Sequence, residues 1–534
     1  MSEATSSSSS RLARSAGVAG AATMTSRVLG VVREQVLAAY FGAGNAMDAF
    51  NVAFRIPNLV RDLFAEGAMS AAFVPTFTRR LTHEGKESAW RLGNNVITAL
   101  LLITTVLVLL GIVFAEPLVR LFAGDYADVP GKLQLTVFLT RIMLPFLTLV
   151  ALAAAFMGML NALHRFFIPA LSPAMFNVGT IICAVALVPL MPRWGLPEIS
   201  AVAIGAVVGG LLQAATQWPA LAREGFRYRP ELDFTDEGLR RVLVLMGPGT
   251  IGLAATQVNV FVNTVLATGA GTGAVSWLNY AFRLMYLPIG LFGVSIATAA
   301  VPAVSRHAAA DDRAGIRTTI ADALSLMLML NVPATIGLIA LATPVIRVIF
   351  ERRAFTAGDT AATAAALQFY AIGLVGYSVV RIASPTFYAL NESRTPVTVS
   401  IVSVLVNAAL NVALVRVLGY RGLALGTSIA ALVNAATLLV LLRRRLDGLD
   451  ERRVFVSFAK ITAASLAMGA AAVAVDAYSA RLLPGNALVP QLLRLAAAIG
   501  IAVAVLAAAA HLLHIHEFRR GVALVTSRFG RRRR

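Results

Sequence analysis

The chain has 534 residues, of which 58% are apolar and only 14% are charged, whereas soluble domains average about 45–50% apolar and about 25% charged residues. This composition excludes an ordinary soluble protein and, at about 20 residues per span, leaves room for something near a dozen membrane spans. The formal net charge is +19 and only one cysteine is present. No disulfide framework can form, and the basic stretches lack the interleaved aromatic residues that bind nucleic acid, so no nucleic-acid partner is expected.

Apolar helical runs separated by short polar loops predict an all-α polytopic membrane protein with about fourteen transmembrane helices. The runs cover residues 11–41, 46–79, 90–121, 131–156, 161–189, 197–222, 239–268, 274–305, 314–350, 358–387, 394–417, 421–446, 453–480 and 486–515. Residues 1–10 form a serine-rich tail that we predict to be disordered, and it lacks the apolar core of a signal peptide. The first run is therefore expected to remain as a span.

The loops that follow spans two, six, eight and twelve are rich in arginine and lysine, which places them in the cytoplasm by the positive-inside rule. Their basic residues are Arg79, Arg80, Lys86, Arg223, Arg227, Arg229, Arg240, Arg241, Arg306, Arg313, Arg317, Arg443, Arg444, Arg445, Arg452 and Arg453. An even number of spans then puts both termini in the cytoplasm, including the basic tail 516–534. The predicted location is the cytoplasmic (inner) membrane, with multiple passes.

An internal repeat with a displacement of 227 or 228 residues predicts two similar halves. Gly42-Ala43-Gly44 recurs as Gly269-Ala270-Gly271, and Ala162-Leu163 recurs as Ala389-Leu390. Because the displacement spans six helices, both copies have the same orientation, and a pseudo-two-fold axis along the membrane normal relates them. We predict an N-lobe over 11–233, a C-lobe over 234–452 and two additional helices over 453–515.

Charged residues inside the spans mark candidate functional positions, because each costs a few kcal/mol in the membrane unless it faces water or a partner. These residues are Arg27, Arg33, Glu34, Asp48, Arg55, Arg61, Asp62, Glu66, Arg283 and Arg381. Arginine outnumbers carboxylate, so a shared cavity would be cationic and suited to phosphate oxygens. The alternative is that each arginine pairs with a nearby carboxylate, as Asp62 and Glu66 can with Arg61, or extends to the interface.

Two further polar groups are weaker signals. Asn407 and Asn411 lie one turn apart and, with Asn263 and Thr427, offer oxygens to a cation. Without a carboxylate such a site binds Na⁺ weakly, and hydrogen bonding between helices is the favoured interpretation. Histidines at 511, 514 and 516 together with Glu517 follow the last span and are expected to face lipid headgroups, so no metal or other cofactor is predicted.

A long N-terminal signature gives the chain a family resemblance. Its segments are Ser26-Arg27-Val28-Leu29-Gly30, Phe41-Gly42-Ala43-Gly44, Asp48-Ala49-Phe50, Phe54-Arg55-Ile56-Pro57-Asn58-Leu59, Phe64-Ala65-Glu66-Gly67-Ala68 and Ala72-Phe73-Val74-Pro75. With Ser276-Trp277 and Arg283-Leu284-Met285, this pattern strongly resembles the lipid II flippases of the MurJ (MviN) family. That family belongs to the multidrug, oligosaccharidyl-lipid and polysaccharide exporter superfamily.

The resemblance implies a transporter, not an enzyme, that moves lipid II from the inner to the outer leaflet by alternating access. It implies substrate-binding arginines at Arg27, Arg33, Arg61 and Arg283, and the in-span charge pattern adds Arg55 to this set. Asp48 and Glu66 match the family's loop aspartate and span-two glutamate, and we assign them a gating or supporting role with Glu34 and Arg381. The lipid tail is expected in a groove made with the two additional helices. Some relatives bind sodium through carboxylates, but the matching positions here are Asn263, Asn407 and Asn411, which favours membrane potential as the energy source.

Two alternatives stay open at this point. One is export of another polyprenyl-linked oligosaccharide, and the less favoured one is a membrane glycosyltransferase, for which the outer loops offer no evident catalytic pair of carboxylates. The expected partners are lipid II, membrane lipids and other cell-wall synthesis or division proteins, and the chain is expected to be monomeric.

Overall fold

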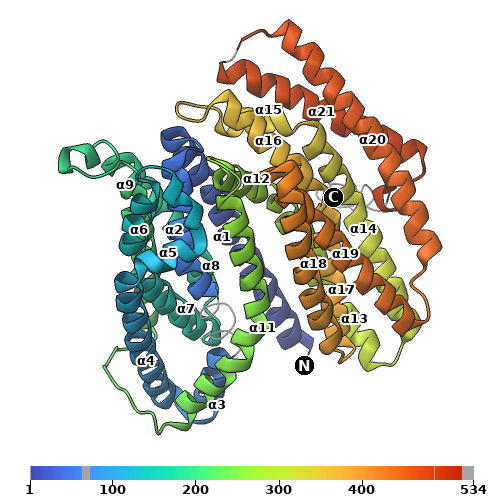
Figure 1. The fold of residues 1–534 in the computed structure, drawn as a ribbon. Coiled ribbons are helices and arrows are strands. Elements are labelled where there is room, and N and C mark those ends of the chain that lie inside the picture. Colours follow the sequence, from blue (N-terminus) through green and yellow to red (C-terminus); the bar gives the residue numbers. More distant parts are fainter. Residues whose placement is uncertain (1, 63–71, 486, 520–534) are drawn as a thin grey trace. The chain divides into compact units, whose positions relative to one another are not determined.

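The computed structural model describes residues 2–62, 72–485 and 487–519, and it contains helices but no strand in those ranges. The chain divides into two compact units (Figure 1). Unit 1 comprises Met1–Ser276 with Arg352–Phe355, and unit 2 comprises Trp277–Glu351 with Thr356–Arg534. The boundary between the two units falls after Ser276, inside the helix α12 (Ala274–Pro288). The predicted lobe boundary at 233/234 stays a prediction.

Unit 1 is a helical bundle in which α8 packs against both α1 and α9, and α4 packs against α7. Its elements are α1 (Ser2–Phe41), α2 (Asn45–Arg61), α3 (Val74–His83), α4 (Gly85–Val113), α5 (Ala115–Ala123), η2 (Gly124–Asp128), α6 (Lys132–Met143), α7 (Phe146–Ala162), α8 (Phe167–Leu187), η3 (Met191–Trp194), α9 (Ser200–Ala215), α10 (Trp218–Arg223), α11 (Glu237–Thr268) and the start of α12 (Ala274–Pro288). Helix α1 begins inside the tail 1–10, whose disorder stays a prediction.

Glycines allow α8 and α9 to approach closely. A Cβ atom added at Gly209 would lie 2.6 Å from the backbone oxygen of Phe176, and one added at Gly205 would lie 3.0 Å from Cβ of Cys183. Both distances are shorter than ordinary van der Waals contact. A side chain at Gly209 would force the backbone of α8 to move, and one at Gly205 would require its neighbours to shift slightly. The two glycines, four residues apart, therefore form a helix-packing surface.

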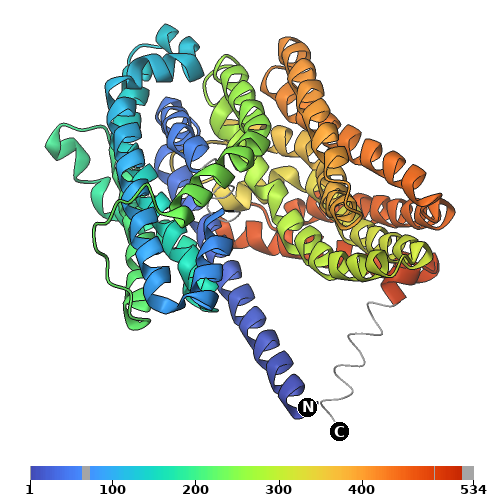
Figure 2. The same ribbon diagram turned by 90° about the horizontal axis from the view of Figure 1, so that it is seen from below.

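Unit 2 has its own core, built mainly from α13, α14, α17 and α19, and α20 packs on α14 with α21 beside it (Figure 2). Its elements are the rest of α12, η4 (Ile289–Gly293), α13 (Val294–Ala309), α14 (Arg313–Ala340), α15 (Ala342–Phe350), α16 (Ala357–Ile372), α17 (Leu374–Ala389), α18 (Arg394–Leu418), α19 (Tyr420–Leu446), α20 (Glu451–Leu482) and α21 (Leu488–Leu512). The π-helical turn η4 follows Pro288, whose ring cannot supply the regular helical hydrogen bond.

The helix boundaries repeat with the displacement found in the sequence. Helix α4 ends at Val113 and α5 spans 115–123, whereas α14 ends at Ala340 and α15 spans 342–350, a displacement of 227 residues. Likewise, α7 and α17 are both capped by a leucine with φ −86° and ψ 9°, at Leu163 and Leu390. The internal repeat is therefore a repeat of structure as well as of sequence.

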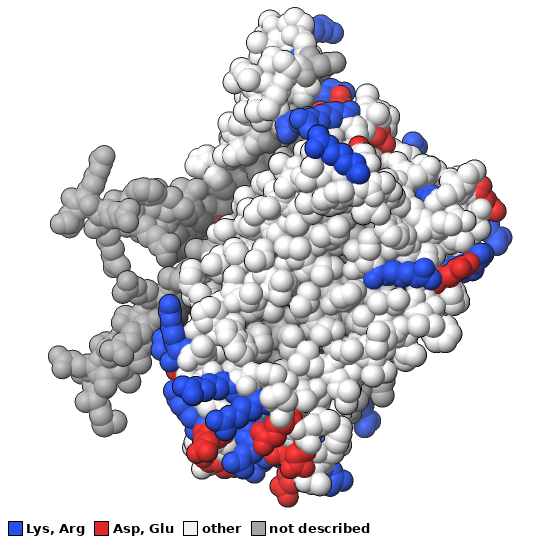
Figure 3. Space-filling view, turned by 90° about the vertical axis from the view of Figure 1, so that its left-hand side faces the viewer, with Lys and Arg blue, Asp and Glu red and all other residues white. Residues whose placement is uncertain are grey.

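Ten helices or helix pairs within the described residues are long and apolar enough to cross a membrane. Each of them coincides with a predicted span, and the remaining four predicted spans correspond to α1, α2 with α3, α11, and α12 with α13. Three of those four spans carry predicted substrate-binding arginines, among them Arg27 on α1, Arg55 on α2 and Arg283 on α12. On the face in Figure 3, charged side chains gather at the lower end, near the upper end and along the right-hand edge, and the broad area between them is largely uncharged. The chain is thus an all-α multi-pass membrane protein, and the count of fourteen stays a prediction.

Candidate functional site

Helix α1 carries two of the predicted arginines. The guanidinium of Arg33 is buried, and its Nη2 atom lies 2.6 Å from Oε1 of Glu34. The guanidinium carbon, Cζ, lies 5.2 Å from the ring centroid of Phe176. Arg27 is half-buried, and within the described part of the chain no carboxylate pairs with it. The structure therefore neutralises Arg33 and leaves Arg27 as a positive charge.

Helix α2 presents a second arginine–carboxylate pair at its end. Arg61 donates to Oδ1 of Asp62 from Nη2 at 2.6 Å and from Nε at 2.9 Å, and both side chains are about one-third exposed. Gln257 of α11 lies 3.5 Å from the other oxygen of Asp62. Arg61 therefore has the acidic partner that the alternative interpretation gave it, and its role in substrate binding stays a prediction. Arg55 is half-buried on the same helix, and Glu66 lies outside the described residues.

Asp48 is the centre of a buried polar network in unit 1. Its carboxylate is fully buried, and Oδ2 lies 3.0 Å from Nζ of Lys132 and 2.7 Å from the backbone nitrogen of Gly273. Oδ1 accepts hydrogen bonds from Ser276, from the backbone N–H at 3.1 Å and from the hydroxyl at 2.7 Å. The ammonium of Lys132 also lies 4.0 Å from the ring centroid of Tyr126.

This network ties three segments together. Asp48 belongs to α2, Lys132 begins α6, and Ser276 lies in the first turn of α12, where a carboxylate also interacts favourably with the helix dipole. Lys132 was not predicted from the sequence as the partner of Asp48. The available signal was that Lys132 is one of three lysines in a chain whose basic residues are otherwise arginine, and that it begins an apolar run.

In unit 2 the two predicted arginines are exposed. Arg283 lies on α12 and Arg381 on α17. Arg381 donates a hydrogen bond to the hydroxyl of Tyr286, and its guanidinium carbon lies 5.7 Å from the centroid of that ring. Among the described residues no carboxylate pairs with Arg381, so no acidic side chain balances its charge.

The predicted asparagine group is divided between the units. Asn407, Asn411 and Thr427 come together in unit 2, where Asn411 donates to Asn407 at 3.1 Å and Asn407 donates to Thr427 at 3.4 Å. Asn263 lies in unit 1 and donates to Asn259 at 3.3 Å. These amides hydrogen-bond to one another and join α18 to α19, which matches the interpretation as helix packing. Among the described residues, no group of three or more His, Cys, Asp or Glu side chains could hold a metal ion.

Basic loops cluster at one end of each unit. In unit 1, Glu224 pairs with Lys86 at 3.2 Å and with Arg165 at 2.8 Å, and hydrogen bonds from these two side chains, led by Arg165, lower the pKa of its carboxyl. In unit 2, Arg313 lies 3.2 Å from Asp447. Loops predicted to share the cytoplasmic side are thus in contact within each unit.

The segment after α10 is attached to α4 by two side-chain amides. Asn95 donates to the carbonyl of Asp233 and accepts from its N–H, both at 2.9 Å. Asn94 makes the equivalent pair with the carbonyl of Arg227 at 3.3 Å and the N–H of Arg229 at 3.2 Å. Each amide imitates a backbone peptide, so the segment is held along its length.

Comparison with known proteins gives a consistent picture. A family model described as lipid II flippase MurJ matches residues 37–492. A probable lipid II flippase MurJ of Vibrio cholerae is 35% identical over 437 residues, covering 80% of this chain and 82% of that one. A lipid II flippase MurJ of Burkholderia cenocepacia is 35% identical over 427 residues, covering 79% and 82%.

Solved structures show the same fold. A lipid II flippase MurJ in an inward closed conformation has a TM-score of 0.76 at 28% identity and covers 93% of this chain and 99% of its own. Two multidrug transporters of the MATE family also match at 16% identity, one inward-facing with a TM-score of 0.67 (81% and 98% covered) and one outward-facing with 0.55 (82% and 95% covered). At that identity the two transporters indicate the fold alone.

Proposed function

The chain belongs to the lipid II flippase MurJ family, and on this premise we propose that it moves lipid II from the inner to the outer leaflet by alternating access. The physical problem is the transfer of an anionic sugar–peptide headgroup through hydrocarbon, where an unpaired charge is very costly. No covalent bond needs to be made or broken.

Arginines carried by the predicted spans are the observation that supports this proposal. Arg27 and Arg381 keep their positive charge, and Arg33 and Arg61 each hold a carboxylate at 2.6 Å. A pyrophosphate offers a guanidinium the same bidentate geometry as a carboxylate. In the proposed mechanism the headgroup enters a hydrated cationic cavity, binds to Arg27, Arg55 and Arg283, and takes the place of Glu34 and Asp62 beside Arg33 and Arg61.

We assign the Asp48 network the role of a gate. It holds the beginning of α12 to α2 and α6, and Ser276 is followed directly by Trp277, the first residue of unit 2. In this proposal, the gate opens when the Asp48 carboxylate breaks its hydrogen bonds to Ser276 and Gly273 together. We also propose that both termini lie in the cytoplasm, with the membrane potential acting through charge displacement at about 2.3 kcal/mol per elementary charge per 100 mV.

Genetic complementation tests the arginines. Cells depleted of their own flippase should not be rescued by Arg27→Ala or Arg283→Ala variants that reach the membrane in normal amounts. Arg120→Ala is the matched control, because the one ion pair of Arg120 within the described ranges is with the exposed Glu116 on the same helix. Rescue by the two cavity variants would contradict the assignment.

Reconstitution tests the activity itself. Labelled lipid II in proteoliposomes should become accessible in the opposite leaflet, and faster with an imposed potential. A lengthened glycan product would instead indicate a glycosyltransferase, and movement of other polyprenyl-linked oligosaccharides in preference to lipid II would indicate the alternative exporter.

A reversible cross-link tests the gate. The hydroxyl of Thr272 lies 3.2 Å from Oδ1 of Asn45, at an exposed position beside the Asp48 network. In a Cys183→Ala background, an Asn45→Cys/Thr272→Cys pair should form a disulfide that stops flipping, and reductant should restore it. Normal flipping by fully cross-linked protein would show that this contact does not need to open.

A further inference from the structure

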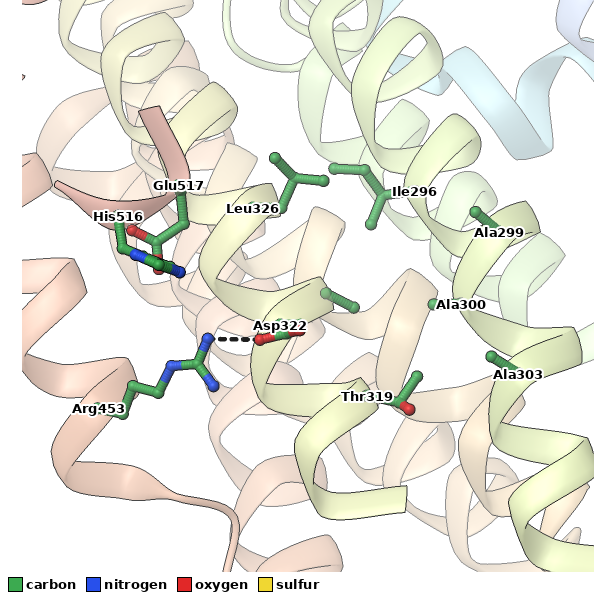
Figure 4. Close-up of a pocket in the computed structure, with 11 residues that line it drawn as sticks. Ile296, Ala299, Ala300, Ala303, Thr319, Asp322, Leu326, Arg453, His516 and Glu517 are labelled. Atoms are coloured by element: carbon green, nitrogen blue, oxygen red, sulfur yellow. Dashed lines mark hydrogen bonds and ion pairs between the residues drawn. The ribbon is translucent and has the colours of Figure 1, made fainter. Parts of the chain in front are cut away.

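A groove in unit 2 lies between α13, α14 and α20, beside the residues that follow α21 (Figure 4). Its volume is about 380 Å³, which is within the range of about 300–1,000 Å³ typical of small-molecule sites. Ile296, Ala299 and Ala303 line it from α13, and Leu326 lines it from α14. The alanines leave room along about one turn of α13, so the interior of the groove is apolar.

Charged side chains surround the other part of the groove. Arg453 of α20 lies 2.5 Å from Asp322 of α14, and both side chains are more than one-third exposed. His516 and Glu517 follow α21 and face the same opening (Figure 4). The mouth therefore carries two carboxylates beside an arginine and a histidine.

The residues after α21 are fixed in place. His514 has a φ of 54°, which ends the helix, and the backbone N–H of Ile515 returns to the carbonyl of Ala510 at 3.0 Å. The side chain of Ile515 is 1% exposed and packs into the core of unit 2. This anchoring holds His516 and Glu517 at the mouth.

Glu517 presents an unusual polar atom. The residue is 8% exposed, and Ser457 donates to Oε1 at 3.1 Å. Its other carboxylate oxygen, Oε2, is buried and accepts no hydrogen bond from the described residues. Leaving such an oxygen without a donor is costly, so a buried carboxylate of this kind indicates a missing cationic partner.

We propose that this groove binds one zwitterionic aminophospholipid of the surrounding membrane. The ammonium donates to the Glu517 carboxylate, the phosphate lies against Arg453 and His516, and one acyl chain follows Ala299 and Ala303. A headgroup with both charges matches the mixed charges of the mouth, whereas Asp322 and Glu517 would repel a purely anionic head. The proposal does not depend on the proposed transport activity.

Lipid binding by the delipidated full-length protein tests the proposal. The probes are dioleoyl phosphatidylethanolamine, dioleoyl phosphatidylcholine and dioleoyl phosphatidylglycerol, with binding measured by native mass spectrometry. Phosphatidylcholine has the same phosphate and chains, but its quaternary ammonium has no N–H to donate. We expect phosphatidylethanolamine to bind about tenfold more tightly than either of the others, as a charge-assisted hydrogen bond predicts.

Two variants separate the two parts of the site. Glu517→Gln should lower phosphatidylethanolamine affinity about tenfold, to the level of phosphatidylcholine. Ala299→Leu, at an exposed position in the groove, should weaken all three lipids, whereas Ala467→Leu on the exposed face of α20 should change none. Equal affinities for the three lipids, or unchanged binding in both groove variants, would overturn the proposal. Binding only by a chain shortened to Arg519 would also overturn it, because the basic tail would then be the partner of Glu517.

Discussion

Replacing Lys132 by methionine should be among the most destabilising single changes in unit 1. Methionine keeps the unbranched stem but removes the ammonium that lies 3.0 Å from Asp48, in a site where the two side chains are 2% and 0% exposed. The carboxylate would stay buried with hydrogen bonds but without a counter-charge. Removing one partner of a buried ion pair costs about 3–5 kcal/mol. Asp48→Asn should cost a similar amount, because it strands the ammonium instead.

The double variant separates this explanation from general damage to the fold. With both charges gone, no unpaired ion is left, and replacing a whole buried pair is often close to neutral. The two single variants together should lower the free energy of unfolding by about 6–10 kcal/mol, and the double variant should lower it by far less. The assay is unfolding of the purified chain in detergent, followed by circular dichroism during a denaturant titration.

An exposed pair provides the control. Glu116 and Arg120 are more than half exposed, and removing either should cost under about 1 kcal/mol. If the Lys132 and Asp48 variants behave like this surface pair, or if their effects simply add, the buried-pair reasoning is refuted.

Three further predictions concern packing, pH and ions. Gly209→Leu should abolish stable expression because no Cβ fits at the α8–α9 crossing, whereas Gly500→Leu, at an open position, should express normally with an unchanged melting temperature. The pKa of Glu224 is lowered in the folded state, so its ion pairs stabilise the fold above the ordinary carboxyl pKa of 4.5 and cease to do so as pH falls through the lowered value. Glu224→Gln should accordingly lower the melting temperature at pH 7 and leave it unchanged in strong acid. Asn407 and Asn411 hydrogen-bond to each other, and no carboxylate belongs to this predicted group. Lipid II flipping in vesicles should therefore proceed at the same rate in Na⁺ and in K⁺. A marked rate increase in Na⁺ would show that these amides coordinate the ion.

The helices and the repeat could be predicted from the sequence because both rest on local patterns. Apolar runs of about 20 residues fix the spans, and the 227-residue displacement reappears at the ends of α4 and α14. The neutralisation of Arg61 by Asp62 is also local, since the two residues are adjacent. The irregular turn η4 also has a local cause, because it begins directly after Pro288.

Contacts between distant segments could not be predicted in this way. Lys132 and Asp48 are 84 residues apart, and no pattern within either helix shows which face meets the other. The same is true of Glu517, whose position depends on the turn at His514 and on the burial of Ile515. An expected headgroup-facing residue became a candidate ligand-binding residue only when its unpaired oxygen was located.

The attachment of residues 227–233 to α4 has a practical consequence for spectroscopy. Asn94 and Asn95 hold this segment through four hydrogen bonds, although it contains no regular secondary structure. A spin label at the exposed Arg227 should therefore give a narrow interspin distance distribution to a second label on α4. Such a pair would provide a fixed internal ruler against which displacements elsewhere during a transport cycle can be calibrated.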